Sequence, residues 1–295
     1  RWNGGTFSGE DGSQPTTTGW RDNPPLTGDD DIVPGRERAP LEFMSPYPAS
    51  TFKLLVAVHT MRLVDQGTID LDGLYRYAPA EGTPMTRTNR ELLDRMITES
   101  DNDSARALLK QLHDLGEIEA MNAGLAGLGL GTLQVADTDP ATGARWGIGK
   151  ITMTSLDTAR LLLLVRGGPG VLGRAPDGRK VRADDVLSRD SRAILLGILV
   201  DQGWNDILTT SNWCGREYPT EGIPSLVADR WLDPDTGAVS VGGKSFGQDV
   251  RPCNDRAEVS FAHKSGFTYN YLSDAGIVRS FAGPEGHYIV VVMSN

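Results

Sequence analysis

The chain reads Pro48-Ala49-Ser50-Thr51-Phe52-Lys53-Leu54-Leu55-Val56-Ala57 at the start of a nearly continuous apolar run that extends to Leu63. Such a run, followed by Gly67, predicts a helix that is buried on most of its sides. Ser50 and Lys53 are three residues apart, so both side chains project from one face of the first turn of this helix. The rest of the chain is interpreted around this pair.

The hydroxyl of Ser50 and the amine of Lys53 have two interpretations. A serine hydroxyl is a weak nucleophile at neutral pH, and a neutral lysine amine within hydrogen-bond reach activates it by taking its proton. The pair is therefore a candidate nucleophile and base. The alternative is that Ser50 only caps the helix and that Lys53 points into water. The spacing alone leaves both interpretations open.

Composition and charge exclude several classes of protein. Hydrophobic residues make up 39% of the 295 residues and charged residues 23%, which is usual for a soluble globular chain. The formal net charge of −10 and the presence of only six lysines oppose a nucleic-acid partner, which needs a concentrated basic surface. The longest aliphatic run, Leu161 to Val165, is far shorter than the roughly 20 residues that cross a bilayer. We expect neither a nucleic-acid partner nor a membrane span.

The two cysteines, Cys214 and Cys253, lie in a region rich in Gly, Pro and Trp. No Cys-x-x-Cys pair or histidine cluster in the sequence indicates a metal site. Either the cysteines form a disulfide in an exported protein, or they are reduced thiols in a cytosolic one. We favour a disulfide that staples an ordered insertion over residues 204–256. The first residues do not have the pattern of a signal peptide, so we expect an exported chain in processed or trimmed form.

Hydrophobic periodicity predicts the main elements. Residues 1–46 are interpreted mostly as loop, with at most one short strand, and residues 123–151 as loop. Helices are expected over 89–99, from 105 onwards, from Thr154 to about Val165 and from Ser188 to Gln202. The turn at residues 100–103 separates two of these helices, and Asn102 or Asp103 is a candidate cap for the second. Strands are expected over 257–263, 275–281 and 287–293, forming an antiparallel meander.

Three short motifs stand at a helix start, at an interhelical turn and at a strand end: Ser50-Thr51-Phe52-Lys53, Ser100-Asp101-Asn102 and Lys264-Ser265-Gly266. In this order and context the chain resembles the penicillin-recognising serine hydrolases, which comprise serine β-lactamases, D-alanyl-D-alanine peptidases and related esterases. Residues 49–55 and the closing run 288–293 are most similar to the class A β-lactamase branch. The resemblance covers roughly residues 41–200 and 257–295.

The resemblance implies an α/β (α+β) fold with two lobes and a site between them. An antiparallel sheet flanked by helices, from residues 1–49 and 203–295, would pack against a mostly helical lobe of residues 50–202. It also implies a monomer that acts on a small-molecule substrate without metal or cofactor.

The resemblance assigns an acylation role to four positions. Ser50 would attack an amide or ester carbonyl, with Lys53 as the base that activates it. Ser100 would pass a proton to the leaving nitrogen. The backbone N–H groups of Ser50 and Phe267 would form the oxyanion hole.

Four further positions would hold the substrate or set the charge of the site. Asn102 would bind the substrate's side-chain amide and contact Lys53. Lys264 would keep positive potential over the site, which favours a neutral Lys53 and attracts an anion. Ser265 would bind the substrate carboxylate, and Gly266 would let the strand approach closely.

The chain departs from class A β-lactamases on the loop that follows the second motif. Those enzymes carry there a glutamate that positions the hydrolytic water, whereas this sequence has no glutamate between Glu119 and Glu217. Asp137 and Asp139 are the carboxylates on the corresponding loop. We therefore expect a β-lactamase-like serine hydrolase that forms an acyl-enzyme on Ser50. The alternatives are a D-alanyl-D-alanine carboxypeptidase and a β-lactam-binding protein without turnover.

Overall fold

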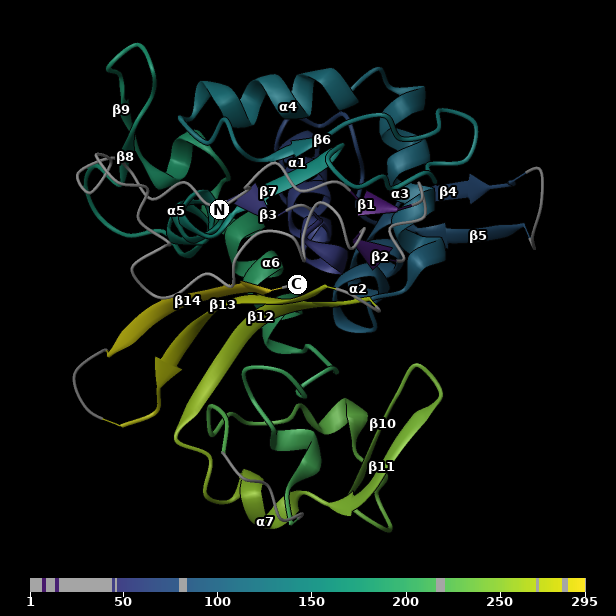
Figure 1. The fold of residues 1–295 in the computed structure, drawn as a ribbon, viewed down its shortest axis with the longest axis vertical. Coiled ribbons are helices and arrows are strands. Elements are labelled where there is room, and N and C mark those ends of the chain that lie inside the picture. The colour runs from purple at the N-terminus through teal and green to yellow at the C-terminus, as the bar shows by residue number, and fades with distance from the viewer. Residues whose placement is uncertain are drawn as a thin grey trace.

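The buried helix predicted after Ser50 is present, and it lies inside the helical part of the protein, against other helices (Figure 1). The structure is a computed structural model, and it describes residues 7–8, 14–15, 44–45, 47–79, 84–215, 221–268, 271–282 and 286–294. Helix α1 spans Lys53–Asp65 and is preceded by the 3-10 helix η2, Ala49–Phe52. Every residue from Lys53 to Met61 is buried, because this segment is apolar on all sides and is covered by other helices.

Side-chain caps begin several of the other helices. Helix α2, Asn89–Thr98, starts with a capping box of Thr88 and Glu91. Helix α5, Ser155–Arg166, is capped by Thr154 as predicted, and helix α6, Arg189–Val200, is capped by Ser188. These hydroxyls accept hydrogen bonds from backbone N–H groups that the first turn leaves unpaired.

Helix α3, Asn102–Asp114, corrects the predicted cap. Its cap is Asp101, whose carboxylate accepts a hydrogen bond from the backbone N–H of Ser104. The prediction of Asn102 or Asp103 as cap is therefore wrong. Because Asp101 satisfies the helix start, the amide of Asn102 is available for other contacts.

The region predicted as loop between residues 123 and 151 contains regular structure. Helix α4 spans Ile118–Gly127, and two short strands, β6 at Gln134–Val135 and β7 at Ile151–Thr154, pair with each other. The glycines in this region obscure the hydrophobic periodicity of a helix in the sequence. Burial of Ile118, Met121 and Leu125 against the core nevertheless stabilises the helix. The loop prediction holds for residues 128–133 and for the segment between the two strands.

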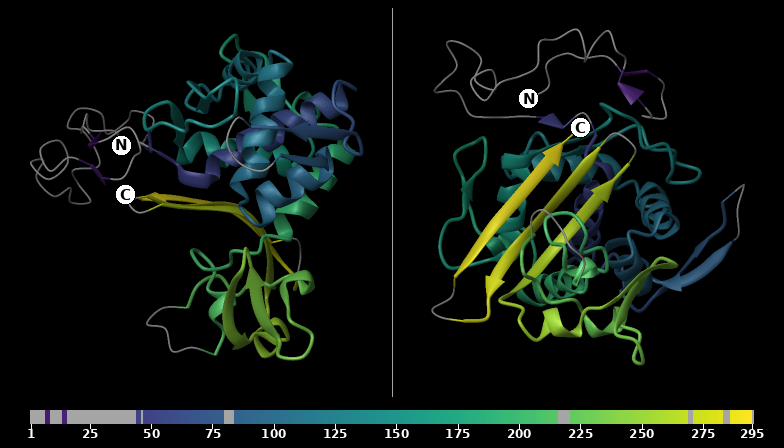
Figure 2. Two further views of the ribbon diagram at one scale, coloured as in Figure 1. Left: turned by 90° about the vertical axis from the view of Figure 1, so that its right-hand side faces the viewer. Right: turned by 60° about the horizontal axis from the view of Figure 1, so that its bottom comes forward.

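The closing strands form an antiparallel sheet in the order β12-β13-β14. They span Val259–Phe267, Leu272–Ser280 and His287–Ser294. Strand β12 is longer than predicted and carries the whole third motif, with Lys264 opposite Ala275. Helices α5 and α6 pack on one face of the sheet, and the insertion lies on the other side (Figure 2).

The remaining described elements are short. Strand β3 (Met44–Ser45) pairs with β7, which also pairs with β6, so these three strands form a small sheet. The others are the hairpins or pairs β1 (Phe7–Ser8) with β2 (Gln14–Pro15), β4 (Leu74–Tyr77) with β5 (Met85–Thr88), β8 (Gly173–Arg174) with β9 (Lys180–Val181), and β10 (Ala238–Val241) with β11 (Lys244–Asp249). Short helical turns are η3 (Ala183–Asp185), η4 (Ser211–Trp213), η5 (Asp229–Trp231) and α7 (Arg251–Asn254).

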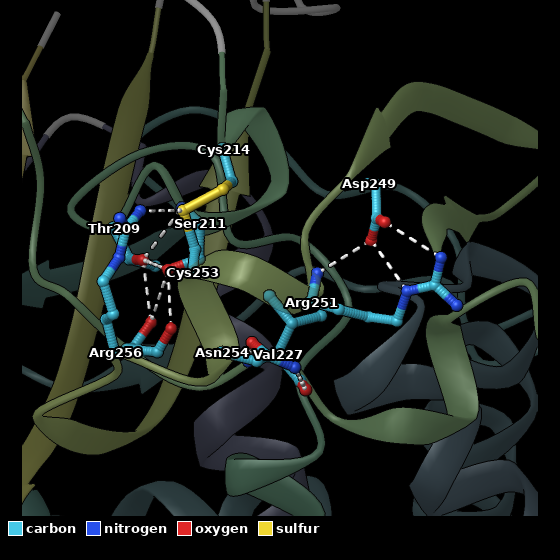
Figure 3. Close-up of a disulfide and its surroundings, with 10 residues drawn as sticks. Thr209, Ser211, Cys214, Val227, Asp249, Arg251, Cys253, Asn254 and Arg256 are labelled. Atoms are coloured by element: carbon cyan, nitrogen blue, oxygen red, sulfur yellow. Dashed lines mark hydrogen bonds and ion pairs between the residues drawn. A yellow bond between two sulfur atoms is a disulfide. The ribbon is translucent and has the colours of Figure 1, made fainter. Parts of the chain in front are cut away.

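The insertion 204–256 has an apolar cluster of its own, built around Phe246 and three valines of the hairpin and its flanks: Val239, Val241 and Val250. The predicted disulfide between Cys214 and Cys253 is present (Figure 3). It joins the segment after η4 to α7, which also contacts the chain through Asn254 and Val227. The bridge and the cluster explain how fifty residues without sustained periodicity are ordered.

Across the described part of the chain, no helix has both the length and the apolar character needed to span a membrane.

Candidate active site

Ser50 lies in η2, where the chain turns into α1. The residue before it, Ala49, has a positive φ of 48°, an uncommon conformation for a residue with a side chain. Neither η2 nor α1 has a side-chain cap, so the alternative interpretation of Ser50 as a helix cap is not supported. The start of η2 is held instead by Ser273 on β13, whose hydroxyl donates to the carbonyl of Pro48 over 2.6 Å.

Lys53 is completely buried, which excludes the alternative of a side chain in water. Its Nζ donates to the carbonyl oxygen of Ser100 and to Oδ1 of Asn102, each over 2.7 Å. Burial lowers the pKa of Lys53 well below its ordinary value, and the nearby charge of Lys264 lowers it further. An amine with a lowered pKa is neutral in a larger fraction of molecules at neutral pH, as a base must be.

Ser100 lies in the turn between α2 and α3 with a positive φ of 57°. Strained conformations of this kind cost on the order of 1–3 kcal/mol and persist where surrounding contacts over-determine them. Here the hydroxyl Oγ lies 3.0 Å from Nζ of Lys264 and 3.3 Å from Nζ of Lys53. The turn therefore places one hydroxyl between two amines, a suitable position for proton transfer.

Lys264 is also completely buried, on strand β12. Its Nζ donates to the carbonyl oxygen of Ser265 over 2.6 Å as well as to Ser100. Burial lowers the pKa of Lys264 to about 7, although the carboxylates of Asp274 and Asp206 oppose this shift. Near neutral pH this amine therefore changes between charged and neutral forms.

Gly266 brings β12 against the start of η2. A Cβ atom at this position would lie 2.8 Å from the backbone nitrogens of both Ser50 and Thr51, and 2.6 Å from Oγ of Ser273. Distances this short do not occur, so only glycine permits the approach. The next residue, Phe267, has a side chain that is 74% exposed, so any role in the site belongs to its backbone.

The two aspartates of the 137–139 loop are engaged elsewhere. Asp137 forms an ion pair with Arg145 at 3.6 Å, and the carboxylate of Asp139 accepts from the backbone N–H of Ala141. The loop residue that contacts the site is Trp146: Nζ of Lys53 lies 5.6 Å from the centre of an indole ring that also packs edge-on against Phe52. Sequence reasoning missed this contact, because nothing in the spacing of Trp146 connects it to Lys53.

A second set of residues missed from the sequence lies behind Lys264. His263 is fully buried, and its Nδ1 lies 2.8 Å from the carboxylate of Asp274 while its Nε2 lies 3.2 Å from Oδ1 of Asn205. Its position beside the third motif was the only sequence signal. Asn205 belongs to the insertion, so the insertion is bonded to the sheet directly behind the site.

The insertion also forms one wall of a cavity of about 660 Å³ beside Ser100 and Asn102. Trp204 and the turn Gly242-Gly243 of the β10–β11 hairpin line this wall. The indole of Trp204 donates to the carbonyl of Glu99, which fixes the wall to the end of α2. The cleft edge beside the second motif is therefore built partly by the insertion.

Comparison with known proteins agrees with the geometry. A sequence profile of the β-lactamase enzyme family matches residues 44–214, which is more than half of the chain. Curated protein sequences give no match.

Among solved structures, PBP-A is 21% identical, with a TM-score of 0.51 over 85% of this chain and 72% of that chain. A β-lactamase from Chitinophaga pinensis DSM 2588 is 19% identical, with a TM-score of 0.52 over 86% of this chain and 77% of the other. A β-lactamase from Sphaerobacter thermophilus DSM 20745 is 18% identical, with a TM-score of 0.51 over 84% and 74%. These likenesses show the fold.

The fold is that of the penicillin-recognising serine hydrolases, as the sequence resemblance predicted. Within that class, the chain belongs to the β-lactamase enzyme family and is a β-lactamase-like serine hydrolase.

Proposed function

We propose that the chain forms a covalent acyl-enzyme on Ser50 with β-lactams or related amides and esters. The main support for this proposal is the buried amine of Lys53. It donates hydrogen bonds to Ser100 and Asn102, and its pKa is lowered. The amine takes the proton of the Ser50 hydroxyl as its oxygen bonds to the substrate carbonyl carbon. The backbone N–H groups of Ser50 and Phe267 stabilise the oxyanion.

The leaving nitrogen then receives a proton from Ser100. This hydroxyl lies between Nζ of Lys53 and Nζ of Lys264, so the proton taken by Lys53 can be passed through it as the amide bond breaks. Lys264 and Ser265 bind the substrate carboxylate, and Asn102 binds the side-chain amide. No metal or cofactor takes part in this sequence of steps.

We propose further that release of the acyl group is slow. General-base catalysis of hydrolysis needs a carboxylate or amine that holds a water near the ester, and Asp137 and Asp139 are both engaged away from Lys53. Trp146 occupies the side of Lys53 that faces the loop. These observations favour the alternative of a D-alanyl-D-alanine carboxypeptidase, or a β-lactam-binding protein, over an efficient β-lactamase. A PBP-A mutant has been solved as an acyl-enzyme complex with penicillin G.

Intact-mass measurement after mixing with benzylpenicillin tests the proposal. We expect a stoichiometric adduct on Ser50 that persists for minutes or longer, and no adduct on Ser50→Ala. Rapid loss of the adduct with release of the opened lactam would make the chain an efficient β-lactamase. Cleavage of a peptide ending in D-Ala-D-Ala would support the carboxypeptidase. Absence of an adduct, together with equal peptide and ester hydrolysis by the wild type and Ser50→Ala, would contradict acylation at Ser50.

We also propose that the protein is exported and monomeric. The disulfide supports export, because such bridges persist in oxidising compartments. Trapping of free thiols in the producing cells, followed by fractionation, tests export: reduced thiols in a cytosolic fraction would contradict it. Light scattering of the purified protein tests the monomer.

A further inference from the structure

A cavity of about 250 Å³ lies on the loop side of the candidate site. Its lining includes Tyr47, three residues before Ser50, and Thr268, the residue after Phe267. Trp146, which lies over Lys53, forms another wall. The cavity is therefore bordered by residues that lie near the nucleophile in the sequence, that directly follow β12 and that contact the Lys53 amine.

Two guanidinium groups, those of Arg106 and Arg145, give this cavity its charge. None of the described residues that line it carries a carboxylate. Arg106 pairs with Asp103 and Arg145 with Asp137, but both carboxylates lie outside the lining and are 66% and 52% exposed. Water screens such surface pairs, so they contribute little and leave guanidinium N–H groups able to bind a ligand.

The direction of the substrate follows from helix α3. Asn102 and Arg106 are four residues apart, so they lie on one face of α3 a single turn apart. Arg106 is also held over the ring of Trp146, 5.6 Å from its centre. Arg106 lines both this cavity and the larger one beside Asn102, so a group that extends along α3 from a side-chain amide bound by Asn102 meets Arg106 and then Trp146.

We propose that this cavity binds the side chain of the acyl group and selects side chains that carry a carboxylate. The inference rests on the proposed acylation of Ser50 and names the substrate class of the same site. A guanidinium presents paired N–H donors whose spacing matches a carboxylate, and Trp146 and Tyr47 provide flat apolar walls for a ring or an aliphatic chain beside it.

Three penicillins with the same phenyl ring test the selection. They differ at the α-carbon of the side chain, which carries a carboxylate in carbenicillin, hydrogen in benzylpenicillin and an ammonium group in ampicillin. Second-order rate constants for acylation of Ser50 are measured by intact mass. We expect acylation by carbenicillin to be about tenfold faster than by ampicillin, with benzylpenicillin between them. The difference should shrink in 1 M salt, because salt screens exposed charges. Equal rates would overturn the proposal.

Variants of Arg145 test whether this residue causes the preference for a carboxylate on the side chain. Arg145→Gln should reduce the preference for carbenicillin over ampicillin, and Arg145→Glu should abolish or reverse it. Arg189→Glu is the matched control: it makes the same charge change at the exposed start of α6, next to Ser188, which bonds Asp65 at the far end of α1. A preference that survives in both Arg145 variants would overturn the proposal.

Equilibrium binding to Ser50→Ala separates this inference from acylation itself. Calorimetric titration of the three penicillins should show the same order of affinity without any covalent step. If no compound acylates the wild type, the proposed function fails, and the order of affinities still decides the subsite. Equal affinities in Ser50→Ala would contradict the subsite even where acylation occurs.

Discussion

Nζ of Lys53 lies 5.6 Å from the centre of the Trp146 ring, and the same ring packs edge-on against Phe52 at 5.1 Å. The indole closes the side of the lysine that faces the 139–150 loop. It covers part of the Lys53 amine, whose pKa is lowered mainly by burial. It also occupies space in which a carboxylate could activate water. We therefore propose that this side chain opposes release of the acyl group.

Trp146→Glu should shorten the life of the acyl-enzyme, because it introduces a carboxylate near Lys53 and Arg106. General-base catalysis from a well-placed group contributes about 10²–10⁴-fold, so an unoptimised one should give roughly tenfold. Trp146→Gln removes the same packing without adding a base and is the matched control. The rate of adduct loss after removal of free penicillin, followed by intact mass, is the measurement. Equal acyl-enzyme lifetimes in the two variants would show that a carboxylate at position 146 does not act as a base for hydrolysis.

The acylation rate should fall as pH rises above about 7. Lys264 attracts an anionic substrate only when protonated, and its pKa is lowered to about 7, so its charge is lost through that range. Lys53 must instead be neutral, and burial, which lowers its pKa, increases the neutral fraction of this amine. The profile of the second-order acylation rate reports groups of the free enzyme. In Lys264→Arg the guanidinium stays charged, so the acylation rate should no longer fall above about pH 7. If the rate falls in this variant as in the wild type, another group causes the pH dependence.

Gly266→Ala should reduce acylation by about a hundredfold or more. Its Cβ would lie 2.8 Å from the backbone nitrogen of Ser50, so β12 must move away from the nucleophile and from the N–H that stabilises the oxyanion. Gly197→Ala in α6 is the control, because the added Cβ meets nothing within 4 Å. It should leave acylation unchanged and raise stability by up to about 1 kcal/mol. Retained acylation in Gly266→Ala would mean that the close approach is not needed.

Removal of the disulfide should destabilise the protein. On the chain-entropy model, a bridge between residues 39 apart contributes about 4 kcal/mol to the free energy of unfolding. The double variant Cys214→Ala, Cys253→Ala should therefore unfold at lower denaturant than the wild type. Wild type treated with reductant should behave like the variant. If neither treatment shifts the denaturation midpoint, the insertion is ordered by its apolar cluster alone.

The helix starts could be predicted because their physics is local. A capping hydroxyl and the backbone N–H that it satisfies are separated by three residues, so Thr154 and Ser188 identify α5 and α6 directly. The second motif shows the limit of such reasoning. Asn102 and Asp103 were the predicted caps, whereas the cap in the structure is Asp101, which follows Ser100 with its positive φ.

The deacylation question could not be answered from the sequence. Asp137 and Asp139 were the candidates because of their charge, but each forms its contacts within its own loop. Trp146 reaches Lys53 because the loop packs over Phe52, a contact between residues almost a hundred positions apart. The partners of His263 likewise come from β13 and from the insertion.

The sequence by itself determined the order of the three motifs, made Ser50 and Lys53 the candidate nucleophile and base, and limited any disulfide to Cys214 with Cys253. These features follow from local spacing and from having only two thiols. Only the tertiary structure decided the lowered pKa values of Lys53 and Lys264, because burial and neighbouring charge come from segments distant in the chain. It also decided that an indole rather than a carboxylate lies beside Lys53, and that two arginines meet next to the site.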